Sequence, residues 1–279
     1  MVQQLSLYGS IDDSLYDLFI STMKTLSGNP PVLFGNIASV WNPNPSYDIE
    51  KVNAKNQLVE PNRIKLSKSL PFDLVGISSQ KLDHTLLMKL VKNESLLTIE
   101  RLQDFLLTKS DKPDSESKMD IDSEESNELS AAESSWTLSI TDIPAAGTSR
   151  KVSIQSMSES VILSTDESRS SLNLLLNGLG YVHGYQYITL GVKFFLANNL
   201  VVDLQKIWNF TNNSKIQVTE GGFLLKAYVN VSKNTDIDRM NQGETALLAL
   251  QKELHGYVDL SIPDRKCMDS RPNYSNDLI

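Results

Sequence analysis

A long alternating segment at residues 181–196 places the strongest limit on the fold. Its apolar side chains occupy every second position, namely Ile188, Leu190, Val192, Phe194 and Leu196. Polar side chains such as Lys193 lie between them, which is the period of a strand with one buried face. Asn198 and Asn199 then supply a tight turn into an apolar-rich segment at 200–210. The two segments are therefore predicted to form an antiparallel hairpin.

Further strands are predicted along most of the chain. Their ranges are 2–8, 32–41, 63–66, 136–140, 151–154, 161–164, 223–232 and 257–262. Residues 86–91 are compatible with another strand, and residues 96–107 with either a strand or a short helix. Long antiparallel strands in this number predict a single closed or nearly closed β-barrel. The expected fold class is therefore mainly β with flanking helices, a β-rich α+β fold.

Two amphipathic helices are predicted to cover or fill this barrel. The first, at about 11–27, follows a capping box that opens at Ser10. The second, at about 236–255, follows a capping box that opens at Thr235. The apolar stripe of the second helix is expected to be part of the core, and it consists of Ile237, Met240, Leu247, Leu250 and Leu254.

An acidic segment at residues 109–135 divides the chain. It holds nine acids, three lysines and eight serines, so it carries −6 of the net charge of −8. This composition buries too little apolar surface to offset the entropy of ordering, which predicts a disordered insertion. It is either a solvated tether or a target of acid-directed phosphorylation. Residues 1–108 and 136–279 are then the N-terminal and C-terminal parts of one barrel.

The rest of the chain is close to neutral and offers no strong basic surface for nucleic acid. The nearest group of basic residues is expected to be a solvated face, and it consists of Lys51, Lys55, Arg63, Lys65 and Lys68. The longest uncharged stretch, residues 170–192, contains amides, a histidine and four glycines, which argues against a membrane span. The single cysteine indicates a reducing, intracellular compartment.

The sequence holds no recognisable motif for catalysis or metal binding. Its three histidines are far apart and lack the spacing of metal ligands: His84, His183 and His255. In the predicted strands, Asp203 and Asp259 are isolated acids. No catalytic, cofactor-binding or metal-binding residue is therefore expected, and the chain is predicted not to be an enzyme. The alternative is a metal-dependent phosphate hydrolase on a barrel with unrecognised catalytic acids.

Adjacent large side chains in the hairpin predict a contact with a partner. Consecutive strand residues point to opposite faces, so one member of each of two pairs must lie outside the buried face. Phe194 shares the buried face, which leaves Phe195 exposed, whereas the sequence assigns no face to Ile207 or Trp208. An exposed aromatic is either covered by the same chain or anchors a partner. Phe195 and Trp208 are therefore the candidate protein-interface residues.

Several long runs of the sequence resemble a known family. They include MVQQLSLYGS, NPSYDIEKVNAKNQLVEPNRIKLSK, QYITLGVKFF, GGFLLKAYVNVSKNTDIDRM and ETALLALQKELHGYVDLSIPDR. These runs are similar to the family of fungal Mediator subunit 18, part of the Mediator head module. The likeness covers both ends of the chain and nearly everything except the acidic segment and roughly residues 74–107.

The resemblance implies one antiparallel β-barrel with flanking helices, similar to the barrels of triphosphate-tunnel phosphatases. It implies a heterodimer with Mediator subunit 20 and a tether through a helix of Mediator subunit 8. Other head-module subunits and the RNA polymerase II machinery are further implied partners. The implied role is that of a nuclear coactivator of RNA polymerase II transcription, which acts by protein–protein contacts without catalytic residues. No cofactor, membrane contact or direct specific nucleic-acid binding is expected.

Overall fold

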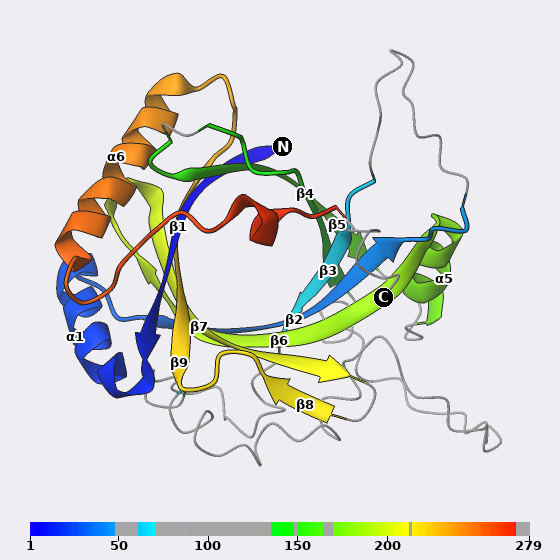
Figure 1. Cartoon of the computed structure of the whole chain (residues 1–279), viewed down its shortest axis with the longest axis horizontal. Coiled ribbons are helices and arrows are strands. Elements are labelled where there is room, and N and C mark those ends of the chain that lie inside the picture. The colour runs from blue at the N-terminus through cyan, green and yellow to red at the C-terminus, as the bar shows by residue number, and fades with distance from the viewer. Residues whose placement is uncertain are drawn as a thin grey trace, which may run out of the picture.

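Nine antiparallel strands form one sheet that closes into a barrel (Figure 1). The computed structural model describes residues 1–47, 61–70, 87, 135–147, 150–163, 170–211 and 214–271. The strand order is β6-β2-β3-β4-β5-β1-β9-β7-β8, and an additional pairing between β6 and β7 closes a ring of eight strands. The ninth strand, β8, extends the sheet from β7. The predicted antiparallel barrel is therefore confirmed.

The elements have the following bounds. The strands are β1 (Val2–Asp12), β2 (Val32–Pro43), β3 (Ile64–Ser69), β4 (Ser135–Thr141), β5 (Ser153–Leu163), β6 (Tyr181–Phe195), β7 (Leu200–Thr211), β8 (Ser214–Gln217) and β9 (Gly222–Val231). The α-helices are α1 (Tyr16–Ser27), α5 (Ser170–Gly178) and α6 (Ile237–Leu254). Short 3-10 helices are η1 (Asp13–Leu15), η4 (Ala197–Asn199) and η5 (Arg265–Met268).

The hairpin predicted from the alternating segment is confirmed. β6 and β7 pair from Gln186 opposite Phe210 to Phe195 opposite Val201. At the turn, Asn198 and Asn199 both adopt positive φ angles, 60° and 57°, in the left-handed region that asparagine tolerates better than most residues. This hairpin supplies the pairing that closes the ring.

The apolar faces of the strands lie outside the barrel, where α1 and α6 cover them (Figure 1). Phe194 of β6 packs edge-on against Phe19 of α1, with ring centroids 6.3 Å apart. Of the predicted stripe of α6, Leu247, Leu250 and Leu254 are buried in the same cluster and Met240 packs against it. Ile237, at the start of the helix, is 67% exposed, so its prediction as a core residue is wrong. Gly243 lets α6 approach the sheet, since a Cβ there would lie 3.1 Å from Val229 Cγ1. The two predicted helices thus cover the barrel and do not fill it.

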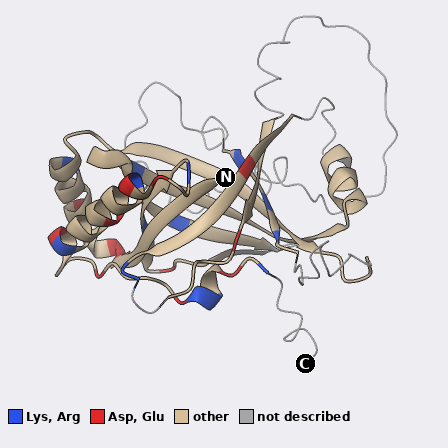
Figure 2. Cartoon of the chain, turned by 90° about the horizontal axis from the view of Figure 1, so that it is seen from above, with Lys and Arg blue, Asp and Glu red and all other residues tan. Residues whose placement is uncertain are grey.

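A second, smaller core lies under α5, an element that the sequence analysis did not predict. Leu172 and Leu176 of α5 are buried together with aliphatic and tryptophan side chains of β2, β3 and β4, namely Trp41, Ile64, Leu66 and Trp136. In both views of the molecule, α5 lies at the opposite end of the barrel from α1 and α6 (Figures 1 and 2). Among the described helices, none combines the length and apolar character needed to cross a membrane.

The structure corrects the predicted start of the first helix and the predicted cap of the second. β1 continues to Asp12, because it pairs with β9 as far as Gly222, and α1 begins only after η1. The buried face of α1 consists of Tyr16, Phe19, Ile20 and Met23. At α6, the N-cap is Asp236, whose carboxylate accepts a hydrogen bond from the backbone N–H of Arg239.

Two predicted strand assignments are also wrong. The segments 151–154 and 161–164 were predicted as two strands, but residues 153–154 and 161–163 belong to one strand, β5. Its first half pairs with β1 and its second half pairs with β4. Segment 257–262 makes only an isolated bridge, between Ser261 and Tyr8. The acidic insertion, apart from Ser135, and the segments 86–91 and 96–107, apart from Leu87, lie outside the described residues.

Candidate functional site

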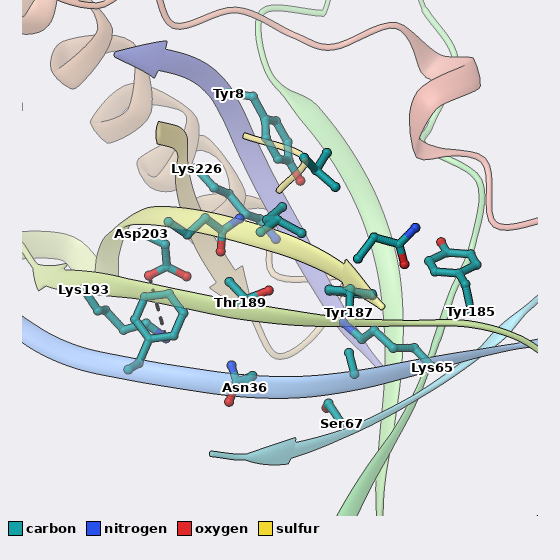
Figure 3. Close-up of a pocket in the computed structure, with 16 residues that line it drawn as sticks. Tyr8, Asn36, Lys65, Ser67, Tyr185, Tyr187, Thr189, Lys193, Asp203 and Lys226 are labelled. Atoms are coloured by element: carbon teal, nitrogen blue, oxygen red, sulfur yellow. Dashed lines mark ion pairs between the residues drawn. The ribbon is translucent and has the colours of Figure 1, made fainter. Parts of the chain in front are cut away.

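The interior of the barrel contains a polar cavity of about 490 Å³ (Figure 3). Successive strand residues alternate between the outer apolar face and this lumen. On β6, for example, Tyr187, Thr189 and Lys193 line the cavity, while Ile188 and Leu190 are buried on the other face. The charged lining residues come from four strands, and they are Lys65, Lys193, Asp203 and Lys226.

Asp203 and its neighbours form the electrostatic centre of the lumen. The Asp203 Oδ1 atom lies 3.7 Å from Lys193 Nζ. Burial raises the pKa of Asp203, while the nearby Lys193 and Lys226 lower it in part. Tyr228 hydrogen-bonds to the Asp203 carboxylate, and burial together with the negative charge of Asp203 raises the pKa of Tyr228 above its ordinary value. Asp203 is the one acid among the residues that line the described cavity, and its partners there are a lysine and a tyrosine.

Burial also shifts the other ionisable groups of the lumen. It lowers the pKa of Lys226 to about 8, although the charge of Asp203 opposes this shift. It lowers the pKa of Lys65, and the positive charge of Lys226 lowers it further. Burial and the neighbouring Tyr185 raise the pKa of Tyr187 to about 12. The charged forms of Lys65 and Lys226 are therefore disfavoured, because burial removes water that would solvate their ammonium groups.

Aromatic rings contact two of these lysines. The Lys226 ammonium lies 5.0 Å from the Tyr228 ring centroid and 5.8 Å from that of Tyr8. Lys193 Nζ lies 4.9 Å from the Phe34 ring centroid. Such cation–π contacts stabilise an ammonium group by about 0.5–2 kcal/mol each, depending on how far it is desolvated.

The structure separates the two candidate interface residues. Phe195 is 51% exposed at the end of β6. It lies on the same face of the strand as Lys193, so it belongs to the rim of the lumen. Trp208 is 1% exposed and belongs to the larger apolar core, where it pairs with Ile188 across the hairpin. The expectation that Trp208 offers its side chain to a partner is therefore wrong, because the side chain is buried inside this core.

The other exposed apolar side chains concentrate partly on α5. Leu174 and Leu175 of this helix are 70% and 46% exposed, and Leu179 follows at its C-terminal end with 57%. The helix carries no charged residue, which Figure 2 shows as an uninterrupted tan ribbon. An apolar, uncharged helix surface of this kind is typical of a contact with another protein.

Sequence reasoning missed the lysines of the lumen as a group. The sequence predicts a solvated basic face that includes Lys65 and Lys68, but Lys65 points into the lumen and Lys68 lies over the Trp136 ring. Lys51 and Lys55 of that predicted face lie outside the described residues. Arg63 donates a hydrogen bond to Asn42 Oδ1. Each of the lumen lysines lies on the polar side of an alternating strand, and this position is the sequence feature that indicates the lumen. Within the described ranges, no cluster of three or more His, Cys, Asp or Glu side chains is placed to hold a metal ion.

Known proteins resemble the chain over nearly its whole length. The family described as "Med18 protein" matches residues 3–271. A relative from Saccharomyces cerevisiae, named "Mediator of RNA polymerase II transcription subunit 18", is 48% identical over an alignment of 308 residues that covers 100% of both chains. A relative of the same name from Eremothecium gossypii is 42% identical over 280 residues, again with 100% of both chains covered.

A solved structure shares the fold. It is a chain in the "Structure of the Schizosaccharomyces pombe Mediator head module", with a TM-score of 0.58 and 14% sequence identity. The match covers 94% of this chain and 98% of that chain.

Proposed function

Because the chain belongs to the Med18 protein family, we propose that it is a structural subunit of the Mediator head module. In this role it is a non-catalytic coactivator component for RNA polymerase II transcription, and it acts in the nucleus through protein–protein contacts. The observation that carries the proposal is the 48% identity, over the full length of both chains, to a protein named as this Mediator subunit. The fold shared with a chain of a Mediator head module supports it.

The proposed partners are Mediator subunit 20, as a heterodimer, and a helix of Mediator subunit 8, as a tether. Two features of the surface are suited to such contacts. The exposed leucines of α5 form an uncharged apolar surface, and Phe195 offers a half-exposed aromatic ring at the rim of the lumen. Large aromatic and apolar side chains of this kind contribute most of the binding energy at protein interfaces.

The assembly role is tested by complementation in S. cerevisiae. A strain that lacks its own subunit 18 would receive a tagged copy of this chain, and co-purified proteins would be identified by mass spectrometry. We expect subunits of the head module, including subunits 20 and 8, to be enriched as they are with tagged S. cerevisiae subunit 18. A chain that is expressed and folded but recovers no Mediator subunit would contradict the proposal.

The contact through Phe195 is tested in the same strain. Phe195→Ala should weaken recovery of subunit 20 or subunit 8, because truncation of an interface aromatic often costs more than about 1 kcal/mol of binding. The matched control is Val161→Ala, which changes another exposed apolar strand residue, on β5. Equal recovery of both partners with the folded Phe195 variant and with the control would remove Phe195 from the interface.

The alternative function, metal-dependent phosphate hydrolysis, receives less support from the lumen. That chemistry uses several carboxylates around divalent cations. The charged residues that line the described cavity are instead three lysines and Asp203. A phosphate-release assay with triphosphate substrates and Mg²⁺ or Mn²⁺ separates the two functions. We expect no turnover, whereas turnover that Asp203→Asn abolishes would favour the hydrolase.

A further inference from the structure

The described residues of the lumen hold an excess of positive charge. Lys65 comes from β3, Lys193 from β6 and Lys226 from β9, whereas Asp203 of β7 is the one acid among the residues that line the described cavity (Figure 3). Glu159 of β5 shares the lumen face with Lys65, since Ser139 of β4 pairs with both residues. It is exposed and does not line the described cavity, but its charge favours the protonated forms of Lys65 and Lys226. Three ammonium groups therefore share a cavity with a single lining carboxylate.

The single carboxylate is already engaged by other groups. Asp203 forms the ion pair with Lys193, accepts the hydrogen bond from Tyr228, and lies directly opposite Lys226 in the β7–β9 register. Lys65 lies on the opposite side of the ring, on β3. Within the part of the chain that the structure describes, Lys65 forms no ion pair and no cation–π contact. Its charge thus has no direct partner in the described lumen.

Lys65 and Lys226 repel each other. The charge of Lys226 lowers the pKa of Lys65, so their electrostatic interaction is felt across the lumen. The rings of Tyr8 and Tyr228 stabilise Lys226 in part. The carboxylate of Glu159 acts on both lysines, but it is exposed, so solvent screens it and it offsets their repulsion only in part. An anion between them would supply the remaining counter-charge.

We propose that the lumen of the barrel binds a small phosphate-type oxyanion between Lys65 and Lys226. The two ammonium groups donate charge-assisted hydrogen bonds to such an anion. Tyr187, Ser67 and Asn36 line the same cavity and add hydroxyl and amide donors. The volume of about 490 Å³ lies within the range of small-molecule sites. The proposal does not depend on the assembly role, because it uses no residue assigned to protein contacts.

The binding test is a thermal-shift titration of the full chain with inorganic phosphate at pH 7, with ionic strength held constant by NaCl. At this pH Lys226 is largely protonated, because its pKa is about 8. We expect the melting temperature to rise by a few degrees with phosphate. Lys65→Met and Lys226→Met should each weaken phosphate binding about tenfold or more, since each removes one charge-assisted hydrogen-bond donor. Lys233→Met, which changes an exposed lysine after β9, should leave it unchanged.

The same variants carry a second expected signature. Without phosphate, Lys65→Met and Lys226→Met should melt at a higher temperature than the wild type, because each removes one member of the repelling pair. Phosphate that stabilises the lumen variants as strongly as the wild type binds elsewhere and overturns the proposal. So does a wild type that shows no shift with phosphate at constant ionic strength.

A second experiment tests phosphate binding on the wild type alone, so it does not depend on whether the variants fold. Limited acetylation of lysines, followed by mass spectrometry, should show that phosphate protects Lys65 and Lys226 and leaves Lys233 equally reactive. Unchanged reactivity of both lumen lysines overturns the proposal. A parallel titration with O-phosphoserine identifies the source of the ligand. Binding of free phosphate alone favours an inorganic ion, whereas binding of both probes favours a phosphoryl group on a larger molecule.

Discussion

Lys206 is a buried lysine whose one charged partner among its described contacts is Asp13. Its side chain is 0% exposed on the apolar face of β7, yet it carries an ammonium group. This group lies 2.7 Å from Asp13 Oδ1, 3.3 Å from the Thr219 carbonyl oxygen and 4.6 Å from the centroid of the Phe223 ring. Asp13 belongs to η1, so the ion pair connects the turn before α1 to the barrel wall.

Removal of the carboxylate should therefore cost more stability than removal of the amine. Asp13→Ala leaves a buried ammonium without its counter-ion, and we expect a loss of roughly 1–3 kcal/mol, reduced from that of a fully buried pair because Asp13 is partly exposed. Lys206→Met keeps most of the volume without the charge and should be milder. Urea unfolding of both variants and of the double variant measures the difference. A greater loss for Lys206→Met would contradict this account.

Lys226 should make the stability of the chain depend on pH above neutrality. Its pKa is about 8 in the folded chain against 10.5 without the fold, so the unfolded chain binds more protons between these values. Stability therefore rises with pH through this window, and the destabilisation by Lys226 is fully present below pH 8. Lys226→Met lacks the effect, so its stability advantage over the wild type should shrink between pH 8 and 10.

This comparison isolates Lys226 from the groups around it. Asp203, Lys193, Lys65, Glu159 and the tyrosines Tyr8 and Tyr228 are present in both proteins, and the shifted tyrosines titrate mainly above pH 10. The measurement is urea unfolding in phosphate-free buffer at a series of pH values, with Lys233→Met as the control. An advantage that stays constant or grows from pH 8 to 10 would show that the Lys226 pKa is not depressed.

At the scale of elements, α6 stabilises the fold through one face. Leu250→Ala should cost about 2–5 kcal/mol, because Leu250 is buried between the helix and the sheet. Ile237→Ala is the matched control on the same helix, since Ile237 is 67% exposed, and it should change stability by less than about 0.5 kcal/mol. Denaturant unfolding of the isolated chain measures both. A near-neutral Leu250 variant would place this face of α6 under a partner instead.

The sequence predicts the strands in which apolar and polar residues alternate regularly. It fails where a contact with a residue far away in the sequence breaks this alternation. The alternation at 181–196 and its turn predict β6 and the hairpin because each side chain there follows its face. On β7, Asp203 faces the lumen but Lys206 faces the core, so polarity alone assigns no face to Trp208. Only the ion pair with Asp13, far away in the sequence, explains the buried lysine.

Long-range pairing also explains the misplaced boundaries. Gly9 resembles a strand end in the sequence, but it allows β1 to pass close to the C-terminal segment, where a Cβ would lie 2.8 Å from Val258 Cγ1. The polar middle of β5 resembles a loop, but it is held by β1 on one side and β4 on the other. The lumen site was not predictable for the same reason, because its lysines come from three strands that only the closed ring brings together.

At the scale of the whole molecule, the acidic insertion should be dispensable for folding. Its composition offers little apolar surface to bury, and the strands before and after it pair directly, with Leu66 opposite Leu138. Deletion of residues 109–134 should therefore shift the melting temperature little. Thermal and urea unfolding test this expectation. A loss of several kcal/mol would show that the segment packs on the barrel.

The pairing of the first strand with the last one makes the barrel depend on complete synthesis. β1 pairs with β9 from Gln3 opposite Val231 to Asp12 opposite Gly222. A ribosome releases β1 early and β9 late, so the ring stays open through most of translation, and its unpaired strand edges can bind other chains. A fragment that ends before Gly222 should therefore aggregate, as size-exclusion chromatography would show, and a soluble, folded fragment would contradict this. A chain whose synthesis stops before β9 therefore cannot form the complete barrel. Such incomplete chains would not compete with intact ones for binding partners.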